Sequence, residues 1–318
     1  MFCRTHLPSA AFSWVGIHTK GTFSQMVEVN NTLMHIWNDH TVPQQTAYDA
    51  RCRIKFMGRK GFSHNFKKSS SASTQRPSWK EEGRLPSVSV CTTTYNRSTF
   101  LPLLEQRLRE QDYPSNLIEW VVVDDSDNGK SWAPSPDLPF LLTYRRYPHH
   151  LPLGKKRNLS HSLCTGEVIV YMDDDDYYPA GRISHAVERL RSGNSMIAGS
   201  TFLPILFMPE NELWLSGPFG NNHATAATFA FCRELLAQAR YDDTATMAEE
   251  RSFLADYTRP IVQLDADKTI LCIAHNANTF NKRNMISQGA NSRMRPWPVE
   301  LHPMLLSSLS DYQAASTS

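Results

Sequence analysis

Several features that would each define a class of protein are missing from this sequence. The formal net charge of the 318 residues is only +2, so the chain lacks the basic character of a nucleic-acid-binding protein. Its six cysteines are scattered and form no Cys-x-x-Cys pair, which argues against a zinc site and for reduced thiols. No stretch approaches the roughly 20 apolar residues of a membrane span. We therefore expect a soluble, cytoplasmic protein that binds no nucleic acid.

The amino-acid composition of the chain changes along its length and divides it into regions. Residues 51–68 contain no acidic residue, and a stretch rich in Ser, Pro and charge follows them. This change places a boundary near Pro86, with a small N-terminal appendage and linker of unknown role at 1–85. Residues 86–282 have the pattern of a folded domain, whereas 283–318 have no clear pattern and are expected to form a C-terminal tail or lid.

After Pro86, short apolar strands alternate with amphipathic helices. Hydrophobic patterning predicts strands at 87–95, 118–126, 140–147 and 167–172, and helices at 100–110, 153–166 and 183–190. Strands that are separated by helices pair in parallel through right-handed crossovers. The predicted fold class is therefore α/β, with a mostly parallel sheet covered by helices on both faces.

Three of the predicted strands end in polar residues. In a sheet of this kind, ligands bind at the carboxyl ends of the strands, so we expect the polar clusters to converge on one edge. The clusters are Thr93, Tyr95, Asn96 and Arg97 after the first strand, Asp124 and Asp125 at the second, and Asp173, Asp174, Asp175 and Asp176 after the third.

The run of four aspartates favours a divalent cation. A polymerase-type hairpin is excluded because Pro179 and Gly181 end the extended chain and a helix follows. A calcium loop is excluded because Tyr178 stands where the loop needs glycine. In an extended chain Asp173 and Asp175 point to the same side, where two carboxylates can bind Mn²⁺ or Mg²⁺. A solvated acidic loop is the alternative.

A basic run stands at the start of the helix predicted at 153–166. Lys155, Lys156 and Arg157 oppose the dipole of that helix unless an anion binds beside them. A nucleoside diphosphate leaving group is such an anion, because a divalent cation and nearby Lys or Arg side chains stabilise its developing charge.

Four motifs in this order resemble a known family. The segments "VSVCTTTYNR", "WVVVDDS", "LGKKRN" and "VYMDDDDYYP" are similar to the nucleotide-sugar-binding half of a family 2 glycosyltransferase with the Rossmann-like GT-A fold. The resemblance covers residues 87–282. It implies a nucleotide-sugar half at about 86–200 and an acceptor half at about 201–282.

The resemblance also implies roles for individual residues. Asp175 matches the principal metal ligand of the DXD motif, and Asp173 and Asp174 match its ribose and auxiliary metal contacts. Asp125 matches the acid that contacts the base or ribose. The full set implied to surround the nucleotide sugar adds Thr93, Tyr95, Asn96, Arg97, Asp124, Lys155, Lys156 and Arg157.

Three further residues are expected in the second half. In the family, an acid three residues before an aromatic residue serves as the general base; Glu250 fits this spacing, and the neighbouring Glu249 remains an alternative. His275 resembles a late histidine that acts as an extra metal ligand, and a structural role is its alternative. Trp214 lies in a loop-like segment and is a tentative platform for the acceptor sugar.

These observations predict a metal-dependent, inverting glycosyltransferase that moves a sugar from a nucleotide-diphosphate sugar to an acceptor hydroxyl. Family frequency favours a UDP-hexose as donor and a glycan, protein or small molecule as acceptor. The Gln-x-x-Arg-Trp motif of processive synthases is absent, which implies a non-processive enzyme. A catalytically silent nucleotide-sugar-binding module and a sugar-phosphate nucleotidyltransferase are the alternatives.

Overall fold

The computed structural model describes residues 14–19, 22–29, 32–37, 77–208, 210–276, 278, 282–283, 293–297 and 303–317, the first three ranges and 303–309 through their backbone only. The basic block at 51–68 and much of the tail or lid expected at 283–318 lie outside the described residues.

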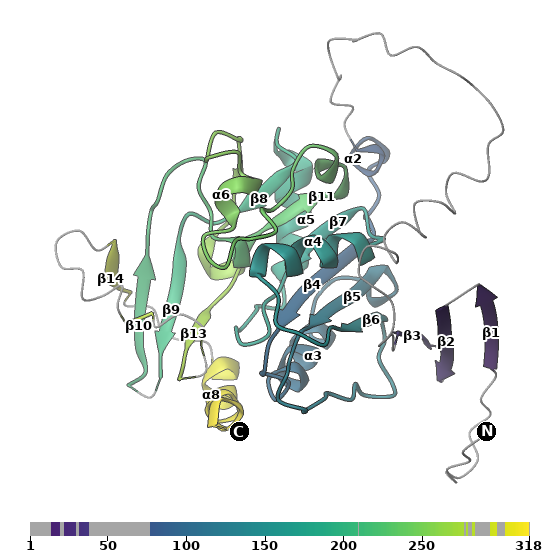
Figure 1. Cartoon of the computed structure of the whole chain (residues 1–318). Helices are drawn as coiled ribbons and strands as arrows, with labels where there is room; N and C mark the ends of the chain where they lie inside the picture. The colour runs from purple at the N-terminus through teal and green to yellow at the C-terminus, as the bar shows by residue number, and fades with distance from the viewer. Residues whose placement is uncertain are drawn as a thin grey trace.

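A ten-stranded sheet runs through the molecule (Figure 1). Its strands follow the order β1-β2-β3-β6-β5-β4-β7-β11-β8-β12. Their bounds are β1 Trp14–Thr19, β2 Thr22–Val29, β3 Thr32–Trp37, β4 Val88–Thr94, β5 Ile118–Asp124, β6 Leu141–Arg146, β7 Val168–Tyr171, β8 Ile197–Gly199, β11 Ala230–Cys232 and β12 Val262–Gln263. The five neighbours from β3 to β7 are all parallel, whereas β11 runs antiparallel to both β7 and β8.

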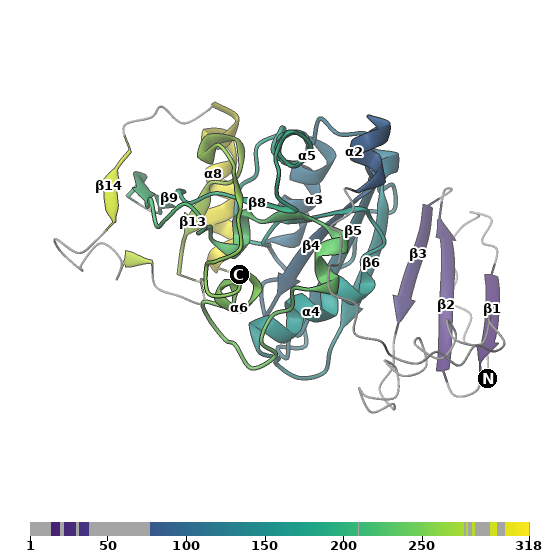
Figure 2. The same ribbon diagram turned by 90° about the horizontal axis from the view of Figure 1, so that it is seen from above.

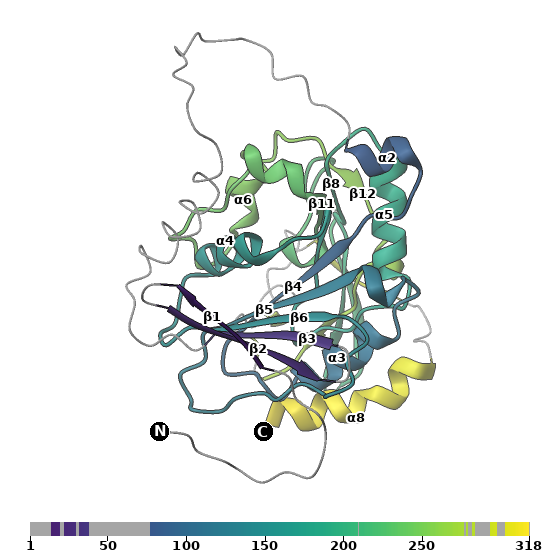
Figure 3. The same cartoon turned by 90° about the vertical axis from the view of Figure 1, so that its right-hand side faces the viewer.

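Helices cover both faces of this sheet, as Figures 2 and 3 show. On one side lie α2, α3 and α5, and on the other lie α4 and α6. Their bounds are α2 Ser78–Glu82, α3 Leu101–Arg109, α4 Leu153–Leu163, α5 Arg182–Ser192 and α6 Glu250–Phe253, and short 3-10 helices lie at η1 Ser115–Leu117, η2 Ala226–Thr228, η3 Arg233–Ala237 and η4 Ala266–Lys268. The predicted fold class, a mostly parallel α/β sheet with helices on both faces, is confirmed.

The two-residue period of a strand explains the two layers of core. In β5, Trp120 and Val122 pack into the cluster that contains residues of α3 and α5. Val121, between them, packs into the opposite cluster with Phe253 of α6. All three side chains are fully buried, as expected for a strand covered on both sides.

A second, four-stranded sheet with the order β13-β9-β10-β14 stands beside the first (Figure 1). Its strands are β9 Leu203–Phe207, β10 Glu212–Ser216, β13 Cys272–Ala274 and β14 Met294–Pro296. The C-terminal helix α8, Pro303–Thr317, packs near the junction: the Tyr312 hydroxyl donates to the carbonyl oxygen of Asp176 at 3.2 Å. The end of the chain is thereby fastened to the turn that follows β7.

Candidate active site

The three polar clusters meet at one edge of the sheet. β4 lies between β5 and β7, and all three strands run in the same direction. The loop after β4 contacts both neighbours: the Asn96 amide donates to the Ser126 hydroxyl at 2.7 Å, and Arg97 pairs with Asp174. The sheet order therefore assembles these residues from segments that are distant in sequence.

Asp125 forms the buried centre of one half of the site. Its side chain is fully buried and accepts a hydrogen bond from the Leu151 amide at 2.7 Å. The Lys156 ammonium lies 3.0 Å from one carboxylate oxygen, and His150 Nδ1 lies 3.0 Å from the other. Tyr95 stacks near this group, with its ring centroid 3.9 Å from that of His150. A flat ring and a carboxylate at the end of β5 provide surfaces suited to a nucleoside.

Asn96 shapes the loop beside Asp125. It has a left-handed backbone with φ of 56°, which asparagine tolerates better than most residues. Its side-chain oxygen accepts from the amides of Asp127 and Asn128, both at 3.2 Å. The Tyr95 hydroxyl also donates to the carboxylate of Asp127 at 3.1 Å. The Asn96 side-chain amide donates to the same carboxylate at 2.9 Å, and the hydrogen bonds from Asn96 and Tyr95 lower the pKa of Asp127.

Two of the residues expected at the nucleotide site support its walls instead. Asp124 is fully buried, accepts from the Ser126 amide at 2.8 Å, and receives a short hydrogen bond from the Tyr144 hydroxyl. Burial raises the pKa of Tyr144, and this bond to Asp124 raises it further. Thr93 is buried near the end of β4. Sequence reasoning missed Tyr144, His150 and Asp127, although Asp127 follows the quoted Asp-Asp-Ser directly.

The aspartate run forms a turn rather than an extended chain. The strand ends at Tyr171, and Asp174 and Asp175 occupy turn positions. The expectation that Asp173 and Asp175 share one side because the chain is extended is therefore wrong. Asp173 approaches Arg157 at 3.4 Å, whereas Asp175 contacts Arg97 at 2.7 Å.

Asp175 is the most strongly held carboxylate of the turn. Its Oδ2 atom contacts Arg97 Nη1 at 2.7 Å, His275 Nε2 at 3.3 Å and Asn278 Nδ2 at 3.0 Å. Burial opposes ionisation of this carboxyl, but Arg97 and His275 outweigh it and hold its pKa well below the usual range. His275 is itself buried and stacks on Phe100 with ring centroids 4.7 Å apart.

The pKa values of Asp174 and Asp176, the two neighbours of Asp175, shift in the opposite direction. Burial raises the pKa of Asp174 to about 7; Arg97 opposes that rise and Asp175 adds to it. Burial raises the pKa of Asp176 to about 7 as well, again with a contribution from Asp175. One ionised carboxylate thus lies between two groups whose ionisation needs additional positive charge.

The turn has a chemistry that suits a divalent ion without a complete cage for it. Among the described residues, no group of three or more His, Cys, Asp or Glu side chains is arranged to hold a metal. Asp175 and His275 are nevertheless adjacent, with His275 Nε2 3.3 Å from Asp175 Oδ2. Mg²⁺ commonly uses one or two protein ligands and takes the rest from phosphate and water. The residues present therefore fit a metal that arrives with a phosphorylated ligand.

The structure separates the two glutamates proposed as bases. Glu249 is buried and accepts a hydrogen bond from Arg157 Nε at 2.9 Å. Glu250 is half-buried, and its nearest hydrogen-bond donor is the Tyr257 hydroxyl at 3.5 Å. Burial and the charge of Glu249 raise the pKa of Glu250. Glu250 is therefore the better proton acceptor, because a strong ion pair with Arg157 already engages Glu249.

Helix α4 places the basic run against the opposite loop. The amide of Gly154 donates to the carbonyl of Ala245 at 2.9 Å, and a Cβ atom on Gly154 would lie 2.0 Å from the carbonyl oxygen of Asp242. Lys156 and Arg157 follow immediately and are buried, while Lys155 is half-buried. Glycine is therefore needed where α4 meets residues 242–245.

Trp214, the tentative acceptor platform, lies on β10 of the small sheet. Its indole Nε1 donates to Glu212 at 3.3 Å, and the ring packs against the cluster of Ile205, Phe207 and Cys272. Among the described residues, its recorded contacts join it to this sheet and not to Glu250. Trp214 thus has a packing role in the structure, and an acceptor role stays a prediction.

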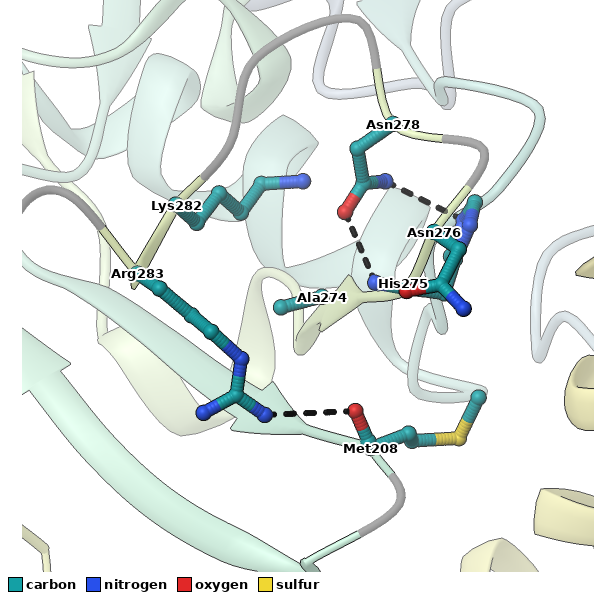
Figure 4. Close-up of a pocket in the computed structure, with 7 residues that line it drawn as sticks. All are labelled: Met208, Ala274, His275, Asn276, Asn278, Lys282 and Arg283. Atoms are coloured by element: carbon teal, nitrogen blue, oxygen red, sulfur yellow. Dashed lines mark hydrogen bonds between the residues drawn. The ribbon is translucent and has the colours of Figure 1, made fainter.

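A cavity of about 170 Å³ lies beside His275, at the ends of β9 and β13 (Figure 4). Its lining consists of Met208, Ala274, His275, Asn276, Asn278, Lys282 and Arg283. The proximity of Asp176 and Asp175 raises the pKa of Lys282 above its usual value, against the effect of burial. Asn278 and Lys282 were missed in the sequence because they lie about a hundred residues after the aspartates they approach.

The comparisons with known proteins agree with this arrangement. A mostly parallel α/β sheet with carboxylates at the ends of its strands is the architecture of enzymes that bind nucleotides at that edge. Residues 89–224 match the family model "Glycosyl transferase family 2", so the chain carries a family 2 glycosyltransferase domain. The match agrees, for residues 89–224, with the family resemblance predicted from the sequence.

Two curated relatives are both named poly(ribitol-phosphate) beta-N-acetylglucosaminyltransferase TarS, from Staphylococcus aureus strains Mu50 and MW2. Each is 30% identical to this chain over 101 residues, which is 28% of this chain and 16% of the relative. The chain thus spans about a sixth of the length of these relatives.

Solved structures with similar backbones include two glycosyltransferases. The mannosyltransferase PcManGT from Pyrobaculum calidifontis, in complex with GDP-Man and Mn²⁺, has a TM-score of 0.48 and 18% identity, over 63% of this chain and 60% of that one. Residues 1–349 of S. aureus TarS with UDP-GlcNAc have a TM-score of 0.46 and 18% identity, over 60% of this chain and 59% of that one. Within the described part of the chain, no helix combines the length and apolar character needed to cross a membrane.

Proposed function

We propose that this protein is a metal-dependent, inverting glycosyltransferase that transfers a sugar from a nucleotide-diphosphate sugar to an acceptor hydroxyl. The observation that carries the proposal is the contact network at the ends of β4, β5 and β7. It joins the acidic turn, through Arg157, to Glu249, which lies next to Glu250 at the start of α6. A cation site and a base on opposite sides of one sugar are what an in-line displacement requires.

The donor would bind along the edge of the main sheet. Asp125 and Tyr95 face the nucleoside, with Lys156 holding the charge of Asp125 in place. Asp175 and His275 would hold the divalent ion, which supplies positive charge that stabilises the departing diphosphate. Arg157 lies between the turn and α6 and adds a second positive charge near that group.

Glu250 would act on the acceptor side. Its carboxylate takes the proton from the acceptor hydroxyl as the oxygen attacks the anomeric carbon, and the bond to the diphosphate breaks on the opposite face. Its raised pKa makes it a stronger base than an ordinary carboxylate, and Tyr257 orients one of its oxygens. A single displacement inverts the anomeric configuration.

For the donor we favour a UDP-hexose of the N-acetylglucosamine class. The curated relatives, which match 28% of this chain, are named N-acetylglucosaminyltransferases. Because that match is short, the acceptor has to be identified by experiment.

Donor turnover is the direct test. Purified protein would be incubated with UDP-GlcNAc, UDP-glucose, UDP-galactose or GDP-mannose, with Mn²⁺ or with EDTA, and released UDP or GDP would be measured. We expect turnover with one UDP-sugar and Mn²⁺, and a loss of about 100-fold in Asp175→Asn. The matched control is Asp256→Asn, which breaks an exposed pair with Arg251.

The result also discriminates between the rival functions. Nucleotide binding without turnover in the wild type would favour a silent binding module. Pyrophosphate release from a nucleoside triphosphate and a sugar phosphate would favour a nucleotidyltransferase. A retained anomeric configuration in the first product, read by NMR, would rule out the single displacement.

A further inference from the structure

We propose that Arg97 is the protein's own counter-cation for the acidic turn, and that it must release Asp175 when a divalent ion binds. Arg97 then becomes a ligand of the donor diphosphate, so that ion and nucleotide bind cooperatively. The identity of the nucleotide rests on the proposed function, whereas the competition between Arg97 and the ion does not.

Arg97 forms ion pairs with two carboxylates at once, those of Asp174 and Asp175. Its Nε and Nη2 atoms lie 3.1 and 2.8 Å from the two oxygens of Asp174, and its Nη1 atom lies 2.7 Å from Asp175. The Arg97 side chain is 16% exposed, and those of Asp174 and Asp175 are 0% and 7% exposed. A planar guanidinium shared between two buried carboxylates is a strong, charge-assisted arrangement.

A divalent ion cannot join this arrangement without disturbing it. The oxygen of Asp175 that contacts Arg97 is also the one nearest to His275, the second metal ligand of the proposal. An ion held by Asp175 and His275 would stand within a few ångströms of the guanidinium. Like charges repel strongly at that distance when solvent is largely excluded. Arg97 and the ion therefore compete for the same carboxylate.

The donor offers Arg97 a new partner. Arg97 lies in the loop after β4, between the Asp125 side and the acidic turn, since Asn96 next to it contacts the loop after β5. A diphosphate placed along this edge presents oxygens that suit the bidentate geometry of a guanidinium. The diphosphate also supplies ligands that complete the coordination of the ion. Each ligand thus removes an obstacle to the other, and the coupling is reciprocal.

The test measures Mn²⁺ binding rather than turnover. Free Mn²⁺ would be followed by electron paramagnetic resonance in titrations of the full chain, with and without UDP or GDP. Binding of Mn²⁺ by nucleotide in buffer would be measured separately and subtracted. For the wild type we expect weak Mn²⁺ binding alone, and a gain of about 5- to 150-fold when the nucleotide is present.

Removing the charge of Arg97 should uncouple the binding of Mn²⁺ from the binding of the nucleotide. In Arg97→Gln, Mn²⁺ alone should bind at least about tenfold more tightly than in the wild type, and the gain from nucleotide should fall towards one. Arg251→Gln is the matched control, because Arg251 pairs with Asp256 on an exposed surface, and it should behave like the wild type. Arg97→Lys keeps the charge but loses the fork, so its Mn²⁺ affinity should lie between those of the wild type and Arg97→Gln.

Two results would overturn the inference. One is a folded Arg97→Gln protein, judged by circular dichroism, that binds Mn²⁺ no more tightly than the wild type. The other, decisive if Arg97→Gln does not fold, is an Arg97→Lys protein with Mn²⁺ affinity at or below that of the wild type. If the Mn²⁺ titrations follow expectation but no donor sugar is ever turned over, the inference stands and the proposed function fails.

Discussion

Two adjacent glutamates of this site differ in their chemistry because only one of them forms an ion pair with Arg157. Glu249 and Glu250 are consecutive, yet only Glu249 reaches Arg157, at 2.9 Å. Burial and the charge of Glu249 raise the pKa of Glu250, and the opposing effect of Arg157 is smaller. The sequence could propose both glutamates from their spacing to Phe253, but it could not choose between them because Arg157 is 92 residues away.

The first prediction concerns the pH dependence of transfer. A base works when it is deprotonated, so the rate should rise with pH through the pKa of Glu250, and this acid limb should lie above the ordinary value of 4.5. Glu250→Gln should lower the rate by about 100- to 10,000-fold at all pH values. Initial rates between pH 4.5 and 8 would check this.

Glu249→Gln serves as the comparison for this prediction. It removes the partner of Arg157 and one negative charge beside Glu250, so the acid limb should move to lower pH while transfer persists. Loss of activity in Glu249→Gln together with an active Glu250→Gln would reverse the assignment of the base.

His161 affects the stability of the fold rather than catalysis. His161 is buried among Tyr171, Phe231 and Phe253, and its Nε2 lies 2.5 Å from the Tyr171 hydroxyl. Burial, with help from the charges of Arg157 and Arg240, lowers its pKa to about 3 from 6.5. The unfolded chain therefore takes up a proton on His161 below pH 6.5, whereas the native protein remains neutral there.

The second prediction follows from that difference. Stability from His161 is present above pH 6.5 and is lost as the pH falls towards 3, amounting to about 2–3 kcal/mol of unfolding free energy between pH 6.5 and 4.5. Urea unfolding at pH 7 and 4.5 should show a smaller loss in His161→Gln than in the wild type. The exposed His149→Gln should show the wild-type loss, and equal losses in all three proteins would contradict the prediction.

At the scale of elements, the ends of strands were predictable and the contacts beyond them were not. Apolar residues fix β4, β5 and β7, and the helix expected after Pro179 and Gly181 is present as α5. The turn at Asp174 depends on Arg97, 77 residues earlier, and on Asn278, which reaches Asp175 across 103 residues. Local periodicity carries no information about partners so distant in the chain.

The third prediction tests how α4 is seated. In Gly154→Ala, the added Cβ would meet the Asp242 carbonyl oxygen at 2.0 Å, so the helix must shift away from residues 242–245. We expect a loss of about 1–3 kcal/mol of unfolding free energy and weaker nucleotide binding, since Lys156 and Arg157 move with the helix. Denaturant unfolding and calorimetric titration with UDP would measure both effects.

Gly181→Ala is the control for α4. This glycine precedes α5, and its added Cβ would find its nearest neighbour at 3.6 Å, an ordinary contact. The substitution should leave stability and UDP affinity close to those of the wild type. If Gly154→Ala is equally silent, the close approach of α4 to the loop is not a constraint.

At the scale of the molecule, the two sheets and the C-terminal helix meet around the acidic turn. The main sheet supplies the nucleotide side, while β13 supplies His275 and α8 contacts Asp176 through Tyr312. The alternation of strands and helices in the sequence predicted the first sheet. It did not predict the second, in which the consecutive strands β9 and β10 pair with β13 and β14 from much later in the chain.

The fourth prediction concerns ligands and the stability of the whole chain. A ligand that binds only the native state stabilises it by about 2.7 kcal/mol at 100 times its Kd. UDP alone should therefore raise the melting temperature, and UDP with Mn²⁺ should raise it further. Asp175→Asn should keep the increment from UDP and lose the increment from Mn²⁺, as read by a thermal-shift assay. An unchanged Mn²⁺ increment in that variant would place the ion elsewhere.

Arg157 touches Asp173 on one side and Glu249 on the other. In the proposed reaction, its single positive charge would therefore act on both the donor side and the acceptor side. The two specificities are consequently not separate modules. We therefore expect that substitutions near Glu249 that admit a different acceptor will also change the affinity for the donor. Selection for a new product would have to adjust both at once.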